Sequence, residues 1–274
     1  MKKKRIRNLV LILGICLCAY PLVASLVEQR NQSRAVSTYK NEVKDYDDET
    51  LRRMIKDAEE YNDKLYQSKS SIVYTLQDDV LSSGNYNKLL NISESGVMGT
   101  IEIPKININL PIYHGTGEDV LSVGVGHLEG SSLPVGGENT HCVLTGHRGL
   151  PNSKLFTRLD ELKKDDLFYV RTGGQIMAYI VSKIQVIRPE DVGELSVQPE
   201  KDMVSLITCT PYGVNSHRLV VTGERIEYEK LKHMQIEPQM ASVREILFAI
   251  LPFVLLGVVA IKLIKERREC NRAK

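Results

Sequence analysis

Three residues of the sequence carry side chains that could perform one reaction together: a histidine, a cysteine and an arginine. His147 follows an apolar run and stands in a glycine-flanked stretch, where a backbone or a ligand can approach closely. Cys209 comes near the end of a second apolar run, just before a Pro-Tyr-Gly turn, and Arg218 begins the run after that turn. The stretches are Thr145-Gly146-His147-Arg148-Gly149, Ser205-Leu206-Ile207-Thr208-Cys209-Thr210-Pro211 and Asn215-Ser216-His217-Arg218-Leu219-Val220-Val221.

Each of these residues has an ordinary structural explanation when it is taken alone. A histidine at a strand end is usually structural or solvated, a cysteine in an apolar strand is usually an inert buried thiol, and an arginine beside a turn is usually on the surface. Together they suit acyl transfer. An imidazolium or guanidinium favours the thiolate of a nearby cysteine. Arginine cannot act as a base, so Arg218 would hydrogen-bond an oxyanion or position a substrate. The expected reaction is attack of Cys209 on a carbonyl, giving a thioester.

Short strands must position these residues. From Val97 onward, runs rich in Ile and Val are bounded by Gly, Pro and Asn, which predicts a closed or partly closed β-barrel. A histidine and a cysteine from different strands can meet at one end of such a barrel, and Arg218 returns to the same end through a hairpin. The expected strands are Gly99–Ile103, Cys142–Thr145, Leu167–Arg171, Met177–Ile187, Met203–Thr208 and Arg218–Glu227, with one short helix over Lys154–Leu162.

The segment before the strands, from Glu28 to about Asn91, is polar and should be helical. Apolar residues recur at helical spacing between Leu51 and Leu65, and Asp47-Asp48-Glu49-Thr50 supplies a cap and an acidic first turn. We expect an amphipathic helical arm between a membrane and the barrel.

Two apolar runs predict membrane spans. Leu9–Val27 is nineteen residues without a charge, about the length that crosses a hydrocarbon core of ~30 Å. Ile246–Ile264 is a second run, interrupted by Lys262. Their basic flanks place both termini in the cytoplasm and residues 28–245 outside, according to the positive-inside rule. A cleaved signal peptide is the alternative for the first run, and a buried core helix is the alternative for the second.

Composition excludes several other classes. A hydrophobic fraction of 42% and a charged fraction of 26% are typical of a folding chain and not of a disordered one. The two ends, Met1–Asn8 and Lys262–Lys274, carry +5 and +4, so the rest of the chain carries −7 of the net +2. Nucleic acid is therefore not an expected partner. No clustered ligand spacing or phosphate-binding glycine loop is present, so neither a metal nor another cofactor is expected.

Only two of the five cysteines, Cys142 and Cys209, lie in the region expected outside the membrane. The chain is therefore not a disulfide scaffold. One bridge between these two cysteines remains the alternative to a nucleophilic Cys209.

Over residues 96–229 the sequence resembles the sortases, and specifically the class C, pilus-building sortases. Four blocks carry the resemblance: Gly-Thr-Ile-Glu-Ile-Pro-Lys at 99–105, Leu-Thr-Gly-His-Arg-Gly-Leu at 144–150, Leu-Phe-Thr-Arg-Leu-Asp at 155–160 and Leu-Ile-Thr-Cys-Thr-Pro-Tyr-Gly-Val-Asn-Ser-His-Arg-Leu at 206–219. It implies a mainly β, eight-stranded sortase-type barrel with short helices, in which His147, Cys209 and Arg218 are catalytic. It also implies cleavage of a Leu-Pro-x-Thr-Gly sorting signal between Thr and Gly. The acyl group then passes to an amine, which in class C is a pilin lysine. The implied partners are pilin proteins that carry the signal, and the cytoplasmic membrane.

The sequence departs from the class C pattern at two places. Ser205 stands where the usual cysteine motif begins with Thr. No proline occurs between Pro21 and Pro104, so the Asp-Pro-aromatic lid anchor of many class C enzymes is absent. A lid of an atypical kind would come from Thr75–Asn91, with Tyr74 or Tyr86 as its aromatic residue. The expectation is an accessible Cys209 at rest.

Three alternatives stay open at this point. They are a cell-wall-anchoring sortase that uses a peptidoglycan precursor amine, a cysteine peptidase in which water resolves the thioester, and a non-enzymatic membrane-anchored pilus-assembly scaffold. The sequence specifies no oligomeric state. The expected organisation is 1–8 cytoplasmic basic tail, 9–27 transmembrane helix or signal anchor, 28–96 helical arm with the atypical lid region, 97–230 catalytic β-barrel, 231–244 linker, 245–264 transmembrane helix and 265–274 cytoplasmic basic tail.

Overall fold

The computed structural model describes residues 2–68, 86–92, 96–150 and 153–227, together with positions 250, 254, 257, 258 and 261. The chain divides into two compact units, one made of Met1–Val27 and Gln239–Lys274 and the other of Glu28–Pro238. All the strands belong to the second unit, which also holds the three candidate site residues.

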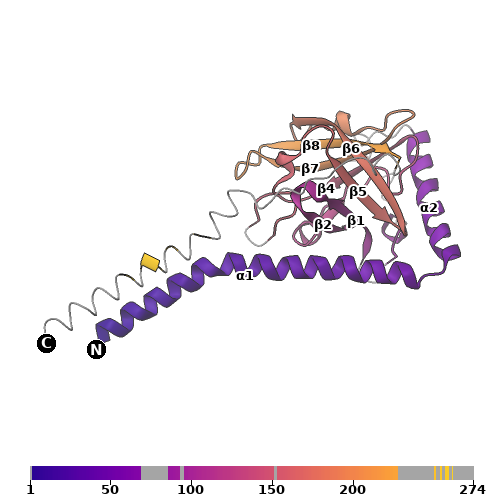
Figure 1. The fold of residues 1–274 in the computed structure, drawn as a ribbon. Helices are drawn as coiled ribbons and strands as arrows, with labels where there is room; N and C mark the ends of the chain where they lie inside the picture. Colours follow the sequence, from indigo (N-terminus) through magenta and orange to yellow (C-terminus); the bar gives the residue numbers. More distant parts are fainter. Residues whose placement is uncertain are drawn as a thin grey trace, which may run out of the picture. The chain divides into compact units, whose positions relative to one another are not determined.

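Eight strands close into a β-barrel (Figure 1), in the order β1-β2-β3-β4-β7-β8-β6-β5. Two neighbouring pairs, β2–β3 and β4–β7, are parallel, and the other pairs are antiparallel. The mainly β, eight-stranded barrel is thus confirmed. The strands are β1 (Val97–Ile103), β2 (Ile108–His114), β3 (Val125–His127), β4 (Thr140–Thr145), β5 (Leu167–Thr172), β6 (Gln175–Ile187), β7 (Asp202–Thr210) and β8 (His217–Ile226).

The six strands expected from the sequence are present, and their ends differ by at most two residues. The sequence pattern missed β2 and β3. Pro111 lies in the middle of β2, and a proline removes a backbone donor, so it argues against a strand there. β3 has only three residues, which is too short for any alternation to be visible.

Apolar side chains fill the barrel interior. They alternate along the strands with residues on the outer face, as the two-residue period of a strand requires. Phe168 and Tyr179 stack across β5 and β6 with ring centroids 5.5 Å apart. Buried members of this core include Ile101, Ile112, Cys142, Leu144, Val170, Leu206 and Val221.

The expected arm, from Glu28 onward, is helical over its first forty residues: it begins in the C-terminal part of α1 (Lys2–Asp45) and continues in α2 (Asp48–Gln67). Asp47 caps α2 as the sequence predicts, because its carboxylate accepts a hydrogen bond of 2.8 Å from the backbone N–H of Thr50. The arm packs directly on the barrel unit. Tyr39 of α1 donates its hydroxyl hydrogen to the carbonyl of Met98, 3.2 Å away, and accepts from the N–H of Gly173 at 3.0 Å.

α2 is also held on the barrel unit by buried residues and by hydrogen bonds. Its buried residues are Ile55, Ala58, Asn62 and Leu65. The Asn62 amide bonds to both backbone groups of Leu133, donating to the carbonyl at 3.2 Å and accepting from the N–H at 2.7 Å. The part of α1 from Glu28 onward and α2 therefore belong to the same folded unit as the barrel.

The helix expected over Lys154–Leu162 is wrong. Only the short 3-10 helix η4 (Leu159–Glu161) forms there. Leu155 has φ = 32°, outside the right-handed helical region, so the backbone turns before a helix can begin. The other short helices are η2 (Tyr86–Lys88), η3 (Pro104–Ile106), α4 (Glu118–Leu121) and η5 (Val192–Leu195).

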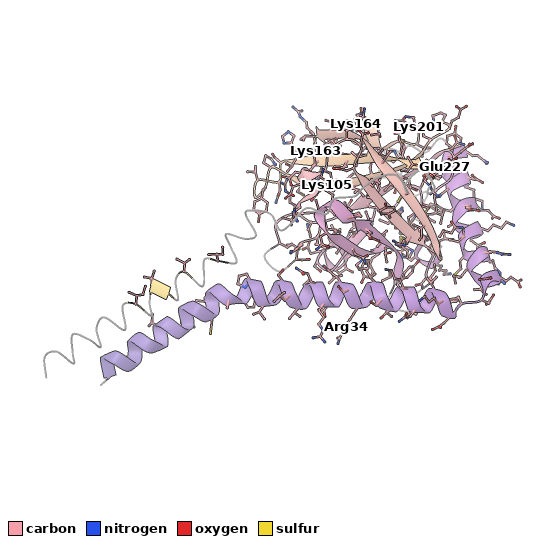
Figure 2. The ribbon with its side chains drawn as sticks, viewed as in Figure 1. Arg34, Lys105, Lys163, Lys164, Lys201 and Glu227 are labelled. Carbon is pink, nitrogen blue, oxygen red and sulfur yellow. The ribbon has the colours of Figure 1, made fainter. Side chains whose placement is uncertain are left out.

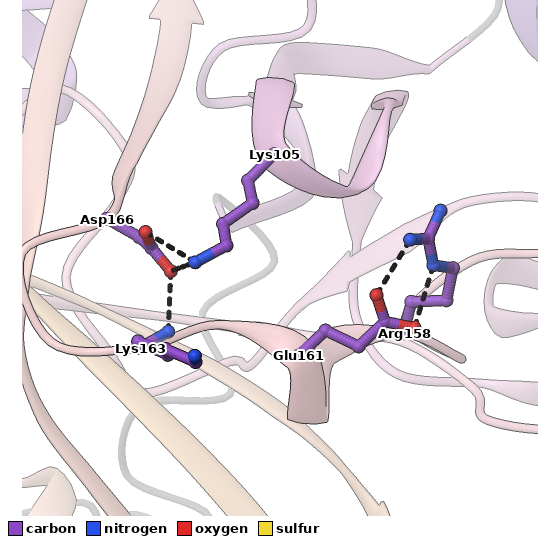
Figure 3. A network of polar contacts seen from close by, with 5 residues as sticks. All are labelled: Lys105, Arg158, Glu161, Lys163 and Asp166. Carbon is purple, nitrogen blue, oxygen red and sulfur yellow. Dashed lines mark hydrogen bonds and ion pairs between the residues drawn. The ribbon is translucent and has the colours of Figure 1, made fainter. Parts of the chain in front are cut away.

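Two ion pairs hold the connections before β5 (Figure 3). Lys105 on η3 donates to both carboxylate oxygens of Asp166 at 2.8 and 2.7 Å, and Asp166 also accepts from the backbone N–H of Lys163. Arg158 and Glu161 form a bidentate ion pair, in which Nε donates to Oε1 at 2.9 Å and Nη2 donates to Oε2 at 2.7 Å. These contacts stabilise the region that follows the candidate histidine along the chain.

Charged side chains surround the barrel on its outside (Figure 2), among them the exposed Lys163, Lys164 and Lys201. In the parts of the chain covered by the structure, we find no helix with both the length and the hydropathy of a bilayer span. The first expected span falls within α1, and the second, Ile246–Ile264, lies mostly outside the described residues.

Candidate active site

Cys209 lies near the end of β7 and faces Arg218 on β8. The two strands are antiparallel, and Cys209 pairs directly with Arg218 one step before the ladder ends at Thr210 and His217. Directly opposed residues in such a ladder have Cβ atoms about 4.5–5.5 Å apart and point to the same face. The hairpin return expected from the sequence therefore brings the arginine beside the thiol.

The parallel pairing of β4 with β7 places the histidine. Thr145 pairs with Ile207 at the end of this ladder, and the N–H of Gly146 then donates to the Ile207 carbonyl at 3.0 Å. The Thr208 hydroxyl donates to the Gly146 carbonyl at 2.7 Å. If the register is continued two residues past the end of this ladder, His147 falls opposite Cys209.

The alternation of side chains puts all three residues on one face. Along β7, Leu206 belongs to the core inside the barrel, whereas Ile207 belongs to a separate apolar cluster on the outer face. Cys209 is two residues from Ile207 and so shares its outer face. The same two-residue step relates Arg218 to Val220 of that cluster. Cys209 and Arg218 therefore lie on the outer face at one end of the barrel, and continuing the alternation past the end of β4 assigns His147 to the same row.

His147 has a carboxylate partner that the sequence reasoning missed. Its Nε2 lies 3.2 Å from Oε2 of Glu118, the first residue of α4. The His147 side chain is 26% exposed and that of Glu118 is 81% exposed. Twenty-nine residues separate the two, and nothing in the local pattern around Glu118 marks it as a partner of a histidine.

Arg218 is held by the loop that joins β7 to β8. Its Nη1 donates to the backbone carbonyls of Asn215 and His217, both at 3.1 Å. The side chain is half-buried beside Cys209. A guanidinium carries five N–H donors, so these two bonds orient the group without using all of its capacity to bind an oxygen.

A disulfide between the two expected exterior cysteines is excluded. Cys142 and Cys209 are both free thiols. Cys142 pairs with Val204, five residues before Cys209 on β7, which is about 16 Å along a strand. It also faces the core and is 3% exposed, and burial raises the pKa of its thiol well above the usual value. Bridged cysteines have Cα atoms less than ~7 Å apart, so this alternative is wrong.

The other buried histidines serve the structure. His127 is fully buried, with Nδ1 2.8 Å from the Tyr86 hydroxyl and Nε2 2.9 Å from the Ser132 carbonyl. His141 lies between the Ser205 hydroxyl at 2.8 Å and the Ser196 carbonyl at 3.0 Å. Burial lowers the pKa of both imidazoles, to about 4 for His127.

His114 is half-buried and also serves the structure. Its Nε2 lies 2.7 Å from the carbonyl of Leu89, and its ring stands edge-on to Tyr86. Burial lowers the pKa of this imidazole as well. The described residues contain no group of three or more His, Cys, Asp or Glu side chains placed to hold a metal ion.

The segment that carries His147 is packed from both sides. A Cβ at Gly146 would come within 2.7 Å of the Phe156 ring, so only glycine lets the chain pass this close. The Arg148 side chain is 6% exposed, forms an ion pair with Asp160 and lies over the Tyr212 ring at 5.9 Å. This arginine thus anchors the segment that carries His147.

A buried apolar cluster adjoins this end of the barrel. It consists of Val143, Leu195, Ile207 and Val220, of which none is more than 7% exposed, with Leu128, Ile187 and Val192 packed against it. The cluster packs β4, β7 and β8 against η5 next to the candidate site.

Tyr86 does not cover Cys209. It is a buried member of the barrel core, whereas Cys209 is on the outer face. Its hydroxyl also accepts from the N–H of Gly115 at 3.1 Å. Tyr86 is therefore wrong as an aromatic lid residue. Tyr74 and most of the expected lid segment lie in 69–85, outside the described residues.

Comparisons with known proteins agree on one family. The family described as Sortase domain matches residues 101–226. Among curated proteins, sortase D of Bacillus subtilis is 36% identical over 131 residues, which are 47% of this chain and 63% of the relative. Sortase A of Streptococcus agalactiae is 33% identical over 131 residues, which are 47% of this chain and 52% of the relative. Less than two thirds of each of these two relatives is matched.

Solved structures resemble a larger part of the chain. Sortase C1 from Streptococcus agalactiae has a TM-score of 0.67 and 44% identity, covering 71% of this chain and 98% of the other. Sortase C of Clostridium perfringens, determined with the C-terminal cell wall sorting motif, has a TM-score of 0.61 and 44% identity, covering 71% of this chain and 99% of the other.

Proposed function

The chain is a member of the sortase family of cysteine transpeptidases, and we propose that it acts as a class C enzyme that joins pilin subunits. Its substrate would be a Leu-Pro-x-Thr-Gly-type sorting signal, cleaved between Thr and Gly. The observation that carries this proposal is the direct pairing of Cys209 with Arg218 at the end of β7 and β8, and the β4–β7 register adds His147 when it is continued two residues past Thr145. The similarity to sortase C structures supports the class.

In the first half of the proposed reaction, the Cys209 thiolate attacks the Thr carbonyl carbon of the signal. The carbonyl oxygen becomes an oxyanion, which the Arg218 guanidinium can stabilise by hydrogen bonds. The Thr–Gly bond then breaks, and the leaving Gly nitrogen takes a proton from the His147 imidazolium. The product is a thioester between Cys209 and Thr.

In the second half, the ε-amine of a pilin lysine attacks the thioester carbonyl. The amine loses a proton to His147, and Cys209 leaves as a thiolate. An amide joins Thr of one subunit to Lys of the next, so atoms and charges balance without a cofactor.

A ladder assay tests the proposal. The full chain is mixed with a pilin that ends in the sorting signal, and the products are separated under denaturing, reducing conditions. We expect a covalent ladder that requires Cys209 and is absent with Cys209→Ala. A matched pilin whose lysines are all replaced by arginine should accumulate as a thioester and form no ladder.

The same assay separates the alternatives. If a short glycine peptide amine resolves the thioester and lysine does not, the chain is a cell-wall-anchoring sortase. Rapid release by water, with no amine product, identifies a peptidase. Failure of Cys209 to form any thioester would leave a non-enzymatic scaffold.

We further propose that the protein is tethered in the cytoplasmic membrane with residues 28–245 outside. The support is the sequence, with its charge-free run Leu9–Val27, its second run Ile246–Ile264 and their basic flanks. Protease added to intact protoplasts should remove residues 28–245 and spare the tail Lys262–Lys274. Digestion of that tail would show that the proposed topology is wrong.

A further inference from the structure

The contact between His147 and Glu118 determines which ring nitrogen carries a proton. An ionised carboxylate only accepts hydrogen bonds, so the Nε2 that lies 3.2 Å from Oε2 of Glu118 must be the donor. A neutral imidazole has a single N–H, and the hydrogen bond at one nitrogen selects the tautomer. The other nitrogen, Nδ1, then keeps its lone pair and is available to a thiol.

The two segments that carry this pair are joined by one buried amide. Gln32 of α1 is 5% exposed, and its Nε2 donates to the Val123 carbonyl at 3.2 Å and to the Ser153 hydroxyl at 2.9 Å. Val123 follows α4, which begins with Glu118, and Ser153 comes six residues after His147. Both NH₂ hydrogens of one side chain are used, so Gln32 ties the carboxylate side of the pair to the histidine side.

Both segments are also rigid locally. The Ser122 N–H donates to the Glu118 carbonyl at 3.0 Å, which fixes the turn of α4. The Phe156 N–H donates to the His147 carbonyl at 3.1 Å. These bonds fix the backbone from which each side chain of the pair extends.

We propose that Glu118 is a positioning residue for His147, which keeps the proton on Nε2 so that Nδ1 exchanges a proton with Cys209, and that Gln32 holds the two segments at the required separation. This proposal rests on the function proposed above. Glu118 contacts neither substrate nor Cys209 and acts only through the histidine.

The expected effect is modest because the carboxylate is 81% exposed. Exposed pairs contribute at most ~1 kcal/mol, which corresponds to about a fivefold change in rate. Glu118→Ala should therefore slow thioester formation by about three- to fivefold through kcat, with KM nearly unchanged. Glu118→Gln keeps an oxygen acceptor and should retain most of the rate. Asp119→Asn is the matched control, since it removes a charge one residue along without touching the pair.

The decisive measurement is the ¹⁵N spectrum of the full chain labelled at histidine, with the His147 signals assigned by their loss in His147→Gln. At alkaline pH the wild type and Glu118→Gln should show a pyrrole-type Nε2 and a pyridine-type Nδ1. Glu118→Ala should show a mixture of tautomers. This readout needs no substrate, so it remains informative if no pilin is joined, and a merely structural role of Glu118 would not change it.

A double-mutant cycle tests the proposal that Gln32 holds the Glu118 and His147 segments together. Gln32→Ala and Glu118→Ala should each slow thioester formation, and the double variant should be no slower than the slower single variant. Additive losses would show that Gln32 acts independently of the pair. An unchanged tautomer in Glu118→Ala, or an equal loss in Asp119→Asn, would overturn the role of Glu118.

Discussion

Cys209 pairs directly with Arg218 across β7 and β8, whereas Arg225, seven residues further along β8, forms an ion pair with Asp202 at 3.6 Å. Asp202 begins β7 and Cys209 is near its end, so the two arginines of β8 lie toward opposite ends of the same hairpin. β8 thus carries two arginines, of which Arg218 lies beside the Cys209 thiol and Arg225 beside the Asp202 carboxylate. This arrangement provides a matched pair of substitutions.

Arg218→Lys should lower kcat for thioester formation by roughly a hundredfold, because loss of one oxyanion donor costs about that much and lysine lacks the planar fork. Arg225→Lys makes the same change on the same strand and should retain nearly full activity. Single-turnover mass spectrometry of the acyl-enzyme measures both. Full activity of Arg218→Lys would show that the Arg218 guanidinium is not needed for thioester formation.

Cys209→Ala should abolish the thioester, whereas Cys142→Ala should keep most of the activity. Cys142 faces the core on β4 and its thiol is buried, so its loss removes packing and leaves the outer-face row intact. Intact-protein mass after incubation with a signal peptide checks both variants. Comparable losses of activity in the two variants would contradict the assignment of Cys209 as the nucleophile.

The fold should lose stability in acid because His127 is buried as a neutral ring. Its pKa is lowered from 6.5 to about 4 by burial, so unfolding takes up a proton between these two values. Stability is therefore complete above pH 6.5 and falls as the pH decreases toward 4, by roughly 3 kcal/mol for this residue alone.

Urea unfolding at several pH values in this window measures the loss of stability. His114 and His141, whose pKa values burial also lowers, add to it in the same direction. NMR titration of His127 provides the check at the level of one residue. A ring that becomes charged near pH 6.5 in the folded protein would contradict the prediction.

The sequence predicts the barrel well because its central strands are long and rich in branched apolar residues. It also predicts that Arg218 lies near Cys209, because a short turn between two strands brings the second strand back antiparallel beside the first. It could not predict β3, Glu118 or the short η4, because these depend on tertiary contacts. Glu118 approaches His147 only after β2, β3 and β4 have paired, and no local residue pattern encodes that approach.

Cys209 should be accessible at rest, because Tyr86 belongs to the core and the sequence lacks the Asp-Pro-aromatic anchor. A variant without residues 75–85 tests this expectation while it keeps Tyr86 and the buried Leu89 and Leu90. Its Cys209 should react with iodoacetamide at nearly the wild-type rate. A tenfold or greater increase, equivalent to ~1.4 kcal/mol of lost occlusion, would show that this segment covers the thiol.

The parallel pairing of β4 with β7 also has a consequence for biosynthesis. The contact between Gly146 and Thr208 joins residues 62 positions apart, and β5 and β6 lie between them in the chain. Such non-local pairs form late, because the entropy of closing a long loop must be overcome first. A nascent chain therefore carries Cys209 as a lone thiol without a histidine beside it. In the proposed mechanism, the reactivity of Cys209 toward other proteins should therefore arise only when the last strands dock on the barrel.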